Sequence, residues 1–187
     1  MLDLDFEKWI VYFEKAGKVN TEKTLVLAKK RGQELGIKNV VLASTHGYTA
    51  QIALKIFENT NVKFITIGTN RELFSGGLLQ SLEEKKLPVI FTNEVEYTYP
   101  QLMRNALKKL SEGMKVCMEI GMAAREKKLI PKEEEVIAIA GTSPRGFDDG
   151  GGADTAIVML PWTSEEFSKL PEKAKRRDIK EIICKPR

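Results

Sequence analysis

The sequence predicts an α/β fold, a single three-layer α/β/α sandwich around a mostly parallel sheet of about five strands, one of them antiparallel. Short apolar runs without polar alternation, which are typical of strands covered on both faces, alternate along the chain with stretches of helical periodicity. The 187 residues, 42% of them hydrophobic, are enough for one sizeable core, and no low-complexity linker divides them. We therefore expect one domain over residues 1–187.

The first elements are a β-prone run, a helix and a strand. Residues 9–13 form the β-prone run. Asn20 is a candidate N-cap for a helix that ends at Gly36, where a glycine readily adopts the left-handed conformation. The run 39–43 is the first strand of the buried type, and a polar turn then leads into a helix over 48–58.

The same unit then repeats. Residues 62–67 predict the next strand, and a turn containing Gly76 and Gly77 precedes a helix that runs to Leu87. The strand 88–92 follows. These alternating elements favour parallel strands joined by crossover helices.

A long amphipathic helical region covers residues 101–127, with apolar residues three and four apart. Gly113 and Gly121 permit a bend or a break within it.

Two further strands of the buried type, 136–140 and 155–160, have a glycine-rich loop between them instead of a helix, so we expect the second to run antiparallel to the first. Residues 179–184 complete the sheet as an edge strand.

Charge and composition narrow the function classes. The segment 172–187 has seven basic and three acidic residues and thus carries the whole net charge of +4. Because its basic run is short and lacks aromatic residues, we expect a solvated segment and no nucleic-acid binding. An acidic N-terminus and the absence of any apolar run near 18 residues predict a cytoplasmic protein without membrane contact. Cys117 and Cys184 form no zinc-binding pattern.

Ligands in open α/β sheets bind beyond the carboxyl ends of the strands, and three loops of unusual composition follow predicted strands there. The first loop is Ser44-Thr45-His46-Gly47-Tyr48-Thr49-Ala50. Gly47 permits a tight turn, and the hydroxyl groups together with the free N–H groups of the helix start form a candidate phosphate site. The alternative is a tight turn with hydroxyl caps and no ligand.

The other two loops are Gly68-Thr69-Asn70-Arg71 and residues 141–152, which contain five glycines. In the long loop, Arg145 is a candidate phosphate partner and Phe147 a candidate cover for a flat ring. The spacing of Asp148, Asp149 and Asp154 matches no EF-hand calcium loop, and the chain has a single histidine, so we expect no dedicated metal site. The single histidine, His46, has no carboxylate assigned to it, and no catalytic residue is identified.

The order of the elements and several motifs resemble the C-terminal α/β domain of pyruvate kinase, and more closely the small, chiefly archaeal proteins that consist of this domain alone. The resemblance covers nearly the whole chain and is weakest at 69–100 and in the basic tail. The motifs that carry it are Val11-Tyr12-Phe13-Glu14 with Gly17, Asn20-Thr21-Glu22, Thr45-His46-Gly47-Tyr48-Thr49-Ala50, Gly113-Met114-Lys115-Val116-Cys117, Leu129-Ile130-Pro131 and 136–141. Together with plentiful Lys and Glu, it predicts a thermophilic archaeon as the source.

The resemblance implies a fold and a ligand but not the kinase reaction. Pyruvate kinase transfers phosphoryl groups in a barrel domain, which takes about 250 residues, so we expect no pyruvate kinase activity. In the kinases the loop that corresponds to 44–50 binds the phosphate of a sugar-phosphate effector. In the stand-alone proteins the comparable pocket is associated with flavin mononucleotide (FMN).

Three departures from the kinase pattern bear on the ligand. Tyr48 stands where the kinases often have a basic residue, Glu133-Glu134 replaces a Gly-Asp turn, and Thr155 stands where Asn is common. Loss of a cation and gain of an aromatic ring disfavour a sugar bisphosphate and favour a flat ring with one phosphate.

We therefore expect FMN, with its phosphate at the helix start, its ribityl hydroxyls on Thr69, Asn70 and Asp154, and its ring near Tyr48 or Phe147. The predicted cofactor-binding residues are Ser44, Thr45, His46, Gly47, Tyr48, Thr49, Gly68, Thr69, Asn70, Gly141, Thr142, Ser143, Arg145 and Asp154.

Three functions stay open at this point. The first is binding of a phosphorylated molecule, most simply FMN, with flavin-dependent oxidoreductase activity as an extension. The second is a non-catalytic regulatory or oligomerisation module that forms a homo-oligomer through the 101–127 region or the edge strands. The third is a magnesium-dependent phosphate-ester hydrolase that uses Asp148 or Asp149.

Overall fold

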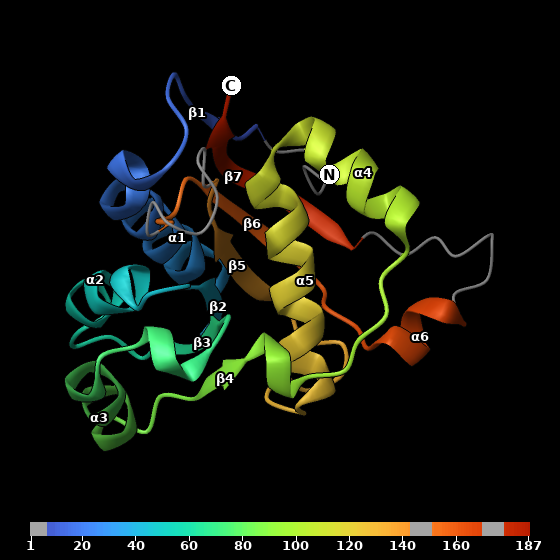
Figure 1. Ribbon diagram of the computed structural model, residues 1–187. Coiled ribbons are helices and arrows are strands. Elements are labelled where there is room, and N and C mark those ends of the chain that lie inside the picture. The colour runs from blue at the N-terminus through green and yellow to red at the C-terminus, as the bar shows by residue number, and fades with distance from the viewer. Residues whose placement is uncertain (1–6, 143–150, 170–177) are drawn as a thin grey trace.

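A computed structural model describes residues 7–142, 151–169 and 178–187 of the chain. The described residues form one mixed sheet in the order β1-β7-β6-β5-β2-β3-β4 (Figure 1). Its strands are β1 (Val11–Phe13), β2 (Asn39–Ala43), β3 (Lys63–Gly68), β4 (Val89–Phe91), β5 (Val136–Ala140), β6 (Thr155–Met159) and β7 (Ile179–Pro186).

Strand directions confirm the predicted mixed sheet. β2 pairs in parallel with both β3 and β5, and β4 continues the parallel set beyond β3. β6 is antiparallel to β5, as expected from the missing crossover helix between them, and it is also antiparallel to β7. All five residues of β5 and of β6 are buried, which explains their unbroken apolar sequences.

The number of strands and the position of the last strand differ from the prediction. Within the described ranges the sheet has seven strands instead of about five, because segments near both ends of the chain join it. The prediction that the last strand lies at the edge is wrong. β1 pairs in parallel outside β7, with Val11 opposite Cys184 and Phe13 opposite Pro186.

Helices cover both faces of the sheet and complete the three layers (Figure 1). On one face α1, α2 and α3 pack through residues such as Leu25, Ala53 and Leu82. On the other face α5 packs through Met114 and Met118, and α4 packs on α5. The helices are α1 (Thr21–Leu35), α2 (Tyr48–Ile56), α3 (Gly76–Glu84), α4 (Gln101–Leu110), α5 (Glu112–Glu126) and α6 (Ser164–Ser168).

Helix ends follow local chemistry, and α3 differs from the prediction at both of its ends. Gly36 ends α1 in the left-handed conformation (φ 69°), as predicted. Gly76 and Gly77 do not form a turn but belong to the first turn of α3. The Ser75 hydroxyl oxygen accepts a hydrogen bond from the Leu78 N–H at 3.3 Å, so the cap starts the helix despite the two glycines. Leu87 lies beyond the end of that helix.

The long helical region breaks at Ser111, not at either glycine. Ser111 is extended (φ −177°, ψ 160°), and its hydroxyl oxygen accepts a hydrogen bond from the Met114 N–H at 3.0 Å, which starts α5. Gly113 instead allows close packing, because a Cβ atom there would lie 2.2 Å from Thr155 Oγ1 on β6. None of the helices within the described ranges is long and apolar enough to cross a bilayer.

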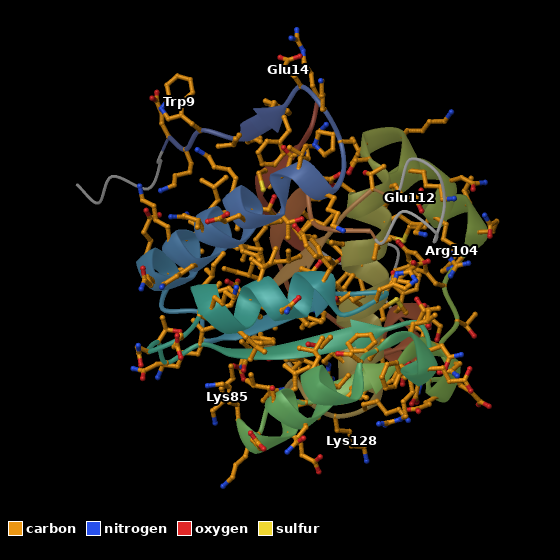
Figure 2. All side chains as sticks on the ribbon, turned by 60° about the vertical axis from the view of Figure 1, so that its left-hand side comes forward. Trp9, Glu14, Lys85, Arg104, Glu112 and Lys128 are labelled. Atoms are coloured by element: carbon orange, nitrogen blue, oxygen red, sulfur yellow. The ribbon has the colours of Figure 1, made fainter. Side chains whose placement is uncertain are left out.

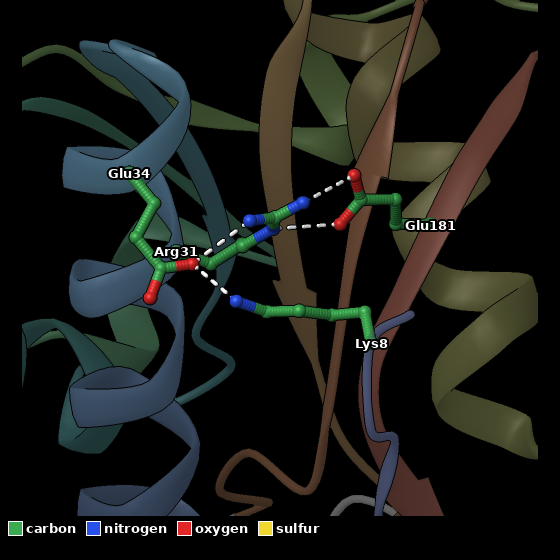
Figure 3. Close-up of polar contacts among 4 residues, drawn as sticks. All are labelled: Lys8, Arg31, Glu34 and Glu181. Atoms are coloured by element: carbon green, nitrogen blue, oxygen red, sulfur yellow. Dashed lines mark hydrogen bonds and ion pairs between the residues drawn. The ribbon is translucent and has the colours of Figure 1, made fainter. Parts of the chain in front are cut away.

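An ion-pair network joins the segment before β1 to α1 and β7 (Figure 3). The Arg31 guanidinium donates two hydrogen bonds of 2.7 Å to Glu181 and one of 2.8 Å to Glu34. The Lys8 ammonium donates to the same Glu34 carboxylate at 2.6 Å. Next to it Trp9 is 89% exposed and points away from the body of the molecule (Figure 2).

Candidate functional site

The carboxyl ends of β2, β3 and β5 meet at one edge of the sheet, because these three strands run in parallel. The loops that follow them therefore lie together. All three line one cavity of about 360 Å³, which we call the three-loop cavity. From the predicted set this cavity brings together Ser44, Thr45, Gly68, Thr69 and Gly141, and the end of the long loop adds Gly151 and Gly152.

The first loop has a cavity on each of its two sides. Ser44 and Thr45 line the cavity just described. His46, Gly47 and Tyr48 instead line a second and more open cavity of about 700 Å³ between α2 and α3. The structure thus does not gather the whole loop around one site.

Local bonding explains the division of this loop. The Ser44 hydroxyl oxygen accepts a hydrogen bond from the Ala50 N–H at 3.3 Å and so caps the first turn of α2. Gly47 is left-handed (φ 83°), and a Cβ atom there would lie 2.3 Å from Leu78 on α3. The hydroxyl cap of the alternative interpretation is therefore present, and Thr49 is buried in the same helical turn.

Tyr48 does not face the three-loop cavity, and it has a cation beside it. The Lys18 ammonium lies 4.0 Å from the centre of the Tyr48 ring. The positive charge that appeared to be lost from the first loop is thus supplied from a segment thirty residues earlier in the chain. The expected contact between a ligand ring in the three-loop cavity and Tyr48 is not supported by this arrangement.

Asp154 is a structural anchor. Its side chain is fully buried, and one carboxylate oxygen accepts hydrogen bonds from the N–H groups of Gly17 at 2.7 Å and Thr142 at 3.0 Å. The other oxygen accepts one from the Thr155 hydroxyl at 2.8 Å. The expected contact with ribityl hydroxyls is thus replaced by contacts that hold the start of the long loop.

The remaining predicted residues have other roles or lie outside the described ranges. The Asn70 side chain accepts a hydrogen bond from the Glu72 N–H and caps a short 3-10 turn at Arg71–Leu73. The backbone N–H of Thr142 donates the hydrogen bond to Asp154 described above. Ser143, Arg145, Phe147, Asp148 and Asp149 lie outside the described residues, as does the basic run 173–177.

The opposite wall of the cavity comes from α5, and the sequence analysis missed it. Glu112, Lys115 and Glu119 line it with their charged side chains, and Val116 and Ile120 supply apolar surface. The three charged residues recur at helical spacing, next to the apolar stripe of the same helix. This spacing was the sequence signal that could have identified them as one charged face.

These charges form a network. Lys115 Nζ lies 2.7 Å from Glu112 Oε1 and 3.3 Å from Glu119 Oε2, and Arg104 of α4 pairs with the other Glu119 oxygen at 2.7 Å. Burial acts to lower the pKa of Lys115, but the hydrogen bond with Glu112 and the charge of Glu119 outweigh it and raise the pKa. Lys115 is therefore a cation at neutral pH.

Tyr97 is an aromatic residue in the lining of this cavity. It is half-buried, and burial together with the negative charge of Glu119 raises its pKa, so the phenol keeps its proton at neutral pH.

Metal-type clusters and the reactivity of Cys117 bear on the chemistry that the described residues could perform. Within it no three His, Cys, Asp or Glu side chains lie close enough to hold a metal ion. Cys117 is buried in the core on α5, and burial raises the pKa of its thiol, which disfavours a nucleophilic thiolate.

Comparison with known proteins gives one family match and similar solved structures. Residues 22–159 match the family model of the pyruvate kinase alpha/beta domain. A Cryptosporidium parvum pyruvate kinase in complex with ADP is 16% identical, with a TM-score of 0.43 over 75% of this chain and 23% of that chain. A second pyruvate kinase structure from the same organism is 15% identical, with a TM-score of 0.42 over 75% and 22%. The chain thus spans less than a quarter of the length of these kinases.

Proposed function

Because this chain belongs to the pyruvate kinase alpha/beta domain family, we propose that it binds a phosphorylated small molecule, FMN, in the three-loop cavity at the carboxyl edge of the sheet. The observation that carries this proposal is the convergence of all three candidate loops on one cavity. Such an edge is where open α/β sheets bind their ligands.

The lining of the cavity fits a ligand with an apolar ring and a polar tail. Its volume of about 360 Å³ is typical of small-molecule sites, which span roughly 300–1,000 Å³. Ile67, Val116 and Ile120 offer apolar surface to a ring, and Tyr97 offers an aromatic one. Thr45 and Thr69 offer hydroxyl groups to a polar tail.

The proposal gives FMN a partly different set of partners from the one expected from the sequence. In this proposal Thr45 and the glycine backbone of the loops hold the phosphate end, and Tyr97 takes the place of Tyr48 beside the ring. FMN supplies electron-transfer chemistry when it is bound. Oxidoreductase activity follows only if a substrate reaches the ring, so binding is the function proposed.

A fluorescence titration tests this function. FMN fluorescence should be quenched on binding to the wild-type protein. Thr45→Glu places a negative charge at the proposed phosphate end and should weaken binding at least tenfold, since like charges repel more strongly away from bulk water.

The matched control introduces the same charge on the other side of the loop. Gln51→Glu lies on exposed α2 and lines the second cavity, so it should leave FMN binding unchanged. Loss of binding in Gln51→Glu but not in Thr45→Glu would place the ligand in the second cavity. Absence of quenching by the wild-type protein would reject FMN. Gly47→Asp is a poor test, because its side chain would collide with Leu78.

One observation favours the alternative function, an oligomerisation module without catalysis. On the outer side of α4, Leu102 is 83% exposed and Leu110 is 48% exposed, with exposed Ala106 between them at helical spacing. Such a row is suited to contact with a second copy of the chain. Light scattering of the purified protein, with the variant described below, measures this association.

A further inference from the structure

The second cavity, between α2 and α3, has a positive lining. Its volume is about 700 Å³, and the charged side chains among its described lining residues are the ammonium groups of Lys18 and Lys55. The single histidine of the chain, His46, lines the same cavity. The acidic residues near the ends of the two helices, Glu58 and Glu84, lie outside the lining. An anion that enters this cavity therefore meets cations and no carboxylate of the described lining.

The charges of the two lysines are not neutralised by other residues. In the part of the chain that the structure describes, neither Lys18 nor Lys55 forms an ion pair with a carboxylate. The Lys18 ammonium lies 4.0 Å from the centre of the Tyr48 ring instead. A ring face attracts an ammonium group without cancelling its charge, so Tyr48 positions Lys18 and leaves its charge for a ligand.

The helix α2 sets the spacing of the two cations. Tyr48, Gln51 and Lys55 are three and four residues apart, and all three line the cavity. Seven residues at 1.5 Å each separate Tyr48 from Lys55 by about 10 Å along the helix. Because Lys18 lies beside Tyr48, the two cations stand at opposite ends of this stripe. This spacing suits an extended anion that has more than one negative charge.

The start of α3 adds neutral hydrogen-bond donors. The Ser75 hydroxyl oxygen accepts from the Leu78 N–H, which leaves the hydroxyl proton for a ligand. Gly77, in the first turn of the helix, also lines the cavity, and a Cβ atom there would have no atom within 4 Å. The backbone is therefore open at the end of the helix where N–H groups carry partial positive charge. These donors supplement the two lysines.

We infer that the second cavity binds an anion with a chain of phosphates, either pyrophosphate or the diphosphate part of a nucleotide, between Lys18 and Lys55. A phosphate chain has several charged oxygens along its length, so it can reach both cations at once. This inference does not depend on the proposed function, because the three-loop cavity lies on the other side of the first loop.

Calorimetric titration with pyrophosphate tests the inference. At about 150 mM salt, where charges beyond about 8 Å are screened, the wild-type protein should bind pyrophosphate at least fivefold more tightly than inorganic phosphate. Lys18→Gln and Lys55→Gln should each weaken pyrophosphate binding about fivefold. Lys85→Gln removes the same charge from an exposed residue outside the lining and should leave the affinity unchanged.

The ring beside Lys18 gives a separate test of the geometry. Tyr48→Phe keeps the ring face and should bind pyrophosphate like the wild-type protein. Tyr48→Leu removes the ring while both lysines remain, and it should weaken binding about threefold. Thermal unfolding checks that each variant folds. Adenosine diphosphate, titrated in the same way, shows whether a nucleotide also serves as the source of the diphosphate.

Three results would overturn the inference. The first is no saturable binding of pyrophosphate by the wild-type protein. The second is an equal loss of binding in Lys85→Gln and in the two lining variants, which would indicate attraction to the surface as a whole. The third is loss of pyrophosphate binding in Thr45→Glu but in neither lining variant, which would place the anion in the three-loop cavity. FMN titration of Lys18→Gln and Lys55→Gln should match the wild-type protein, so the two proposals fail or stand separately.

Discussion

At the scale of single residues, Asp154 shows how one carboxylate connects segments far apart in the sequence. One of its oxygens accepts hydrogen bonds from the N–H group of Gly17, before α1, and from that of Thr142, after β5. A buried carboxylate that receives backbone donors stabilises the fold, because those donors would otherwise be buried without partners. Asp154 therefore fixes the start of the long loop relative to the rest of the sheet edge.

This geometry predicts an unequal effect of two substitutions. Asp154→Asn retains a carbonyl oxygen that can accept both N–H groups and should lower the free energy of unfolding by about 1 kcal/mol. Asp154→Ala leaves both donors without a partner and should lower it by about 3 kcal/mol. Urea denaturation measures the difference. Equal losses in the two variants would show that the backbone hydrogen bonds are not the source of the stabilisation.

Glu34 predicts a pH dependence. Its hydrogen bonds with Lys8 and then Arg31 lower its pKa from 4.5 to about 2. A carboxyl whose pKa is lowered by folding stabilises the native state above its unfolded pKa, and this stabilisation disappears as the pH falls through the folded value. The contribution should therefore be complete above pH 4.5 and be lost between pH 4.5 and about 2.

Urea midpoints measured across this pH range give the test. Glu34→Gln should show a shallower loss of stability between pH 4.5 and about 2 than the wild-type protein. Glu83→Gln, whose side chain is exposed on α3, should keep the wild-type slope. A Glu34→Gln slope equal to that of the wild-type protein would show that the network in Figure 3 does not form in solution.

At the scale of elements, two helical glycines differ in the space around them, so their alanine variants can be compared directly. A Cβ atom at Gly113 in α5 would meet Thr155 at 2.2 Å, whereas one at Gly77 in α3 would have no atom within 4 Å. Gly113→Ala should lower the free energy of unfolding by about 1–3 kcal/mol, because the gain in helix propensity is smaller than the cost of overpacking.

Gly77→Ala should have the opposite effect. It should raise the free energy of unfolding by about 0.5 kcal/mol, because alanine restricts the unfolded chain and prefers the helix. Chemical denaturation of both variants measures the two effects under the same conditions. Stabilisation by Gly113→Ala would mean that α5 does not approach β6 as closely as described.

The elements also show where prediction from sequence succeeds. Uniform apolar runs identified β2 and β5 with their bounds, because burial on both faces leaves no room for polar alternation. The predicted start of α3 was wrong, because the Ser75 cap outweighs the low helix propensity of Gly76 and Gly77. The break at Ser111 was misplaced because the nearby glycines serve packing against the sheet.

At the scale of the whole molecule, the gathering of the three loops was predictable and the opposite wall of the cavity was not. Parallel strands place their carboxyl ends at one edge whatever the side chains are, so Thr45 and Thr69 were expected to meet there. Lys115 and Glu119 sit on a helix that could have turned them to solvent. Their position depends on the rotation of α5 about its own axis relative to the sheet. A single sequence does not specify this rotation.

The exposed row on α4 gives a prediction for the assembled molecule. If the row mediates contact with a second copy, Leu102→Glu should convert the protein to a monomer, because a charge buried in such a contact has no partner. Multi-angle light scattering at several concentrations measures the mass. Lys109→Glu on the same helix is an exposed control and should not change the association. A monomeric wild-type protein would reject this alternative function.

The strand β1 has a consequence for the behaviour of the chain in concentrated solution. It forms one border of the sheet, and a sheet border can template the addition of foreign strands and lead to fibrils. This border is only three residues long, and the Lys185 ammonium lies 5.2 Å from the centre of the Tyr12 ring beside it. So short a stretch, next to a positive charge, offers few main-chain hydrogen bonds to an incoming strand, which disfavours such addition at β1.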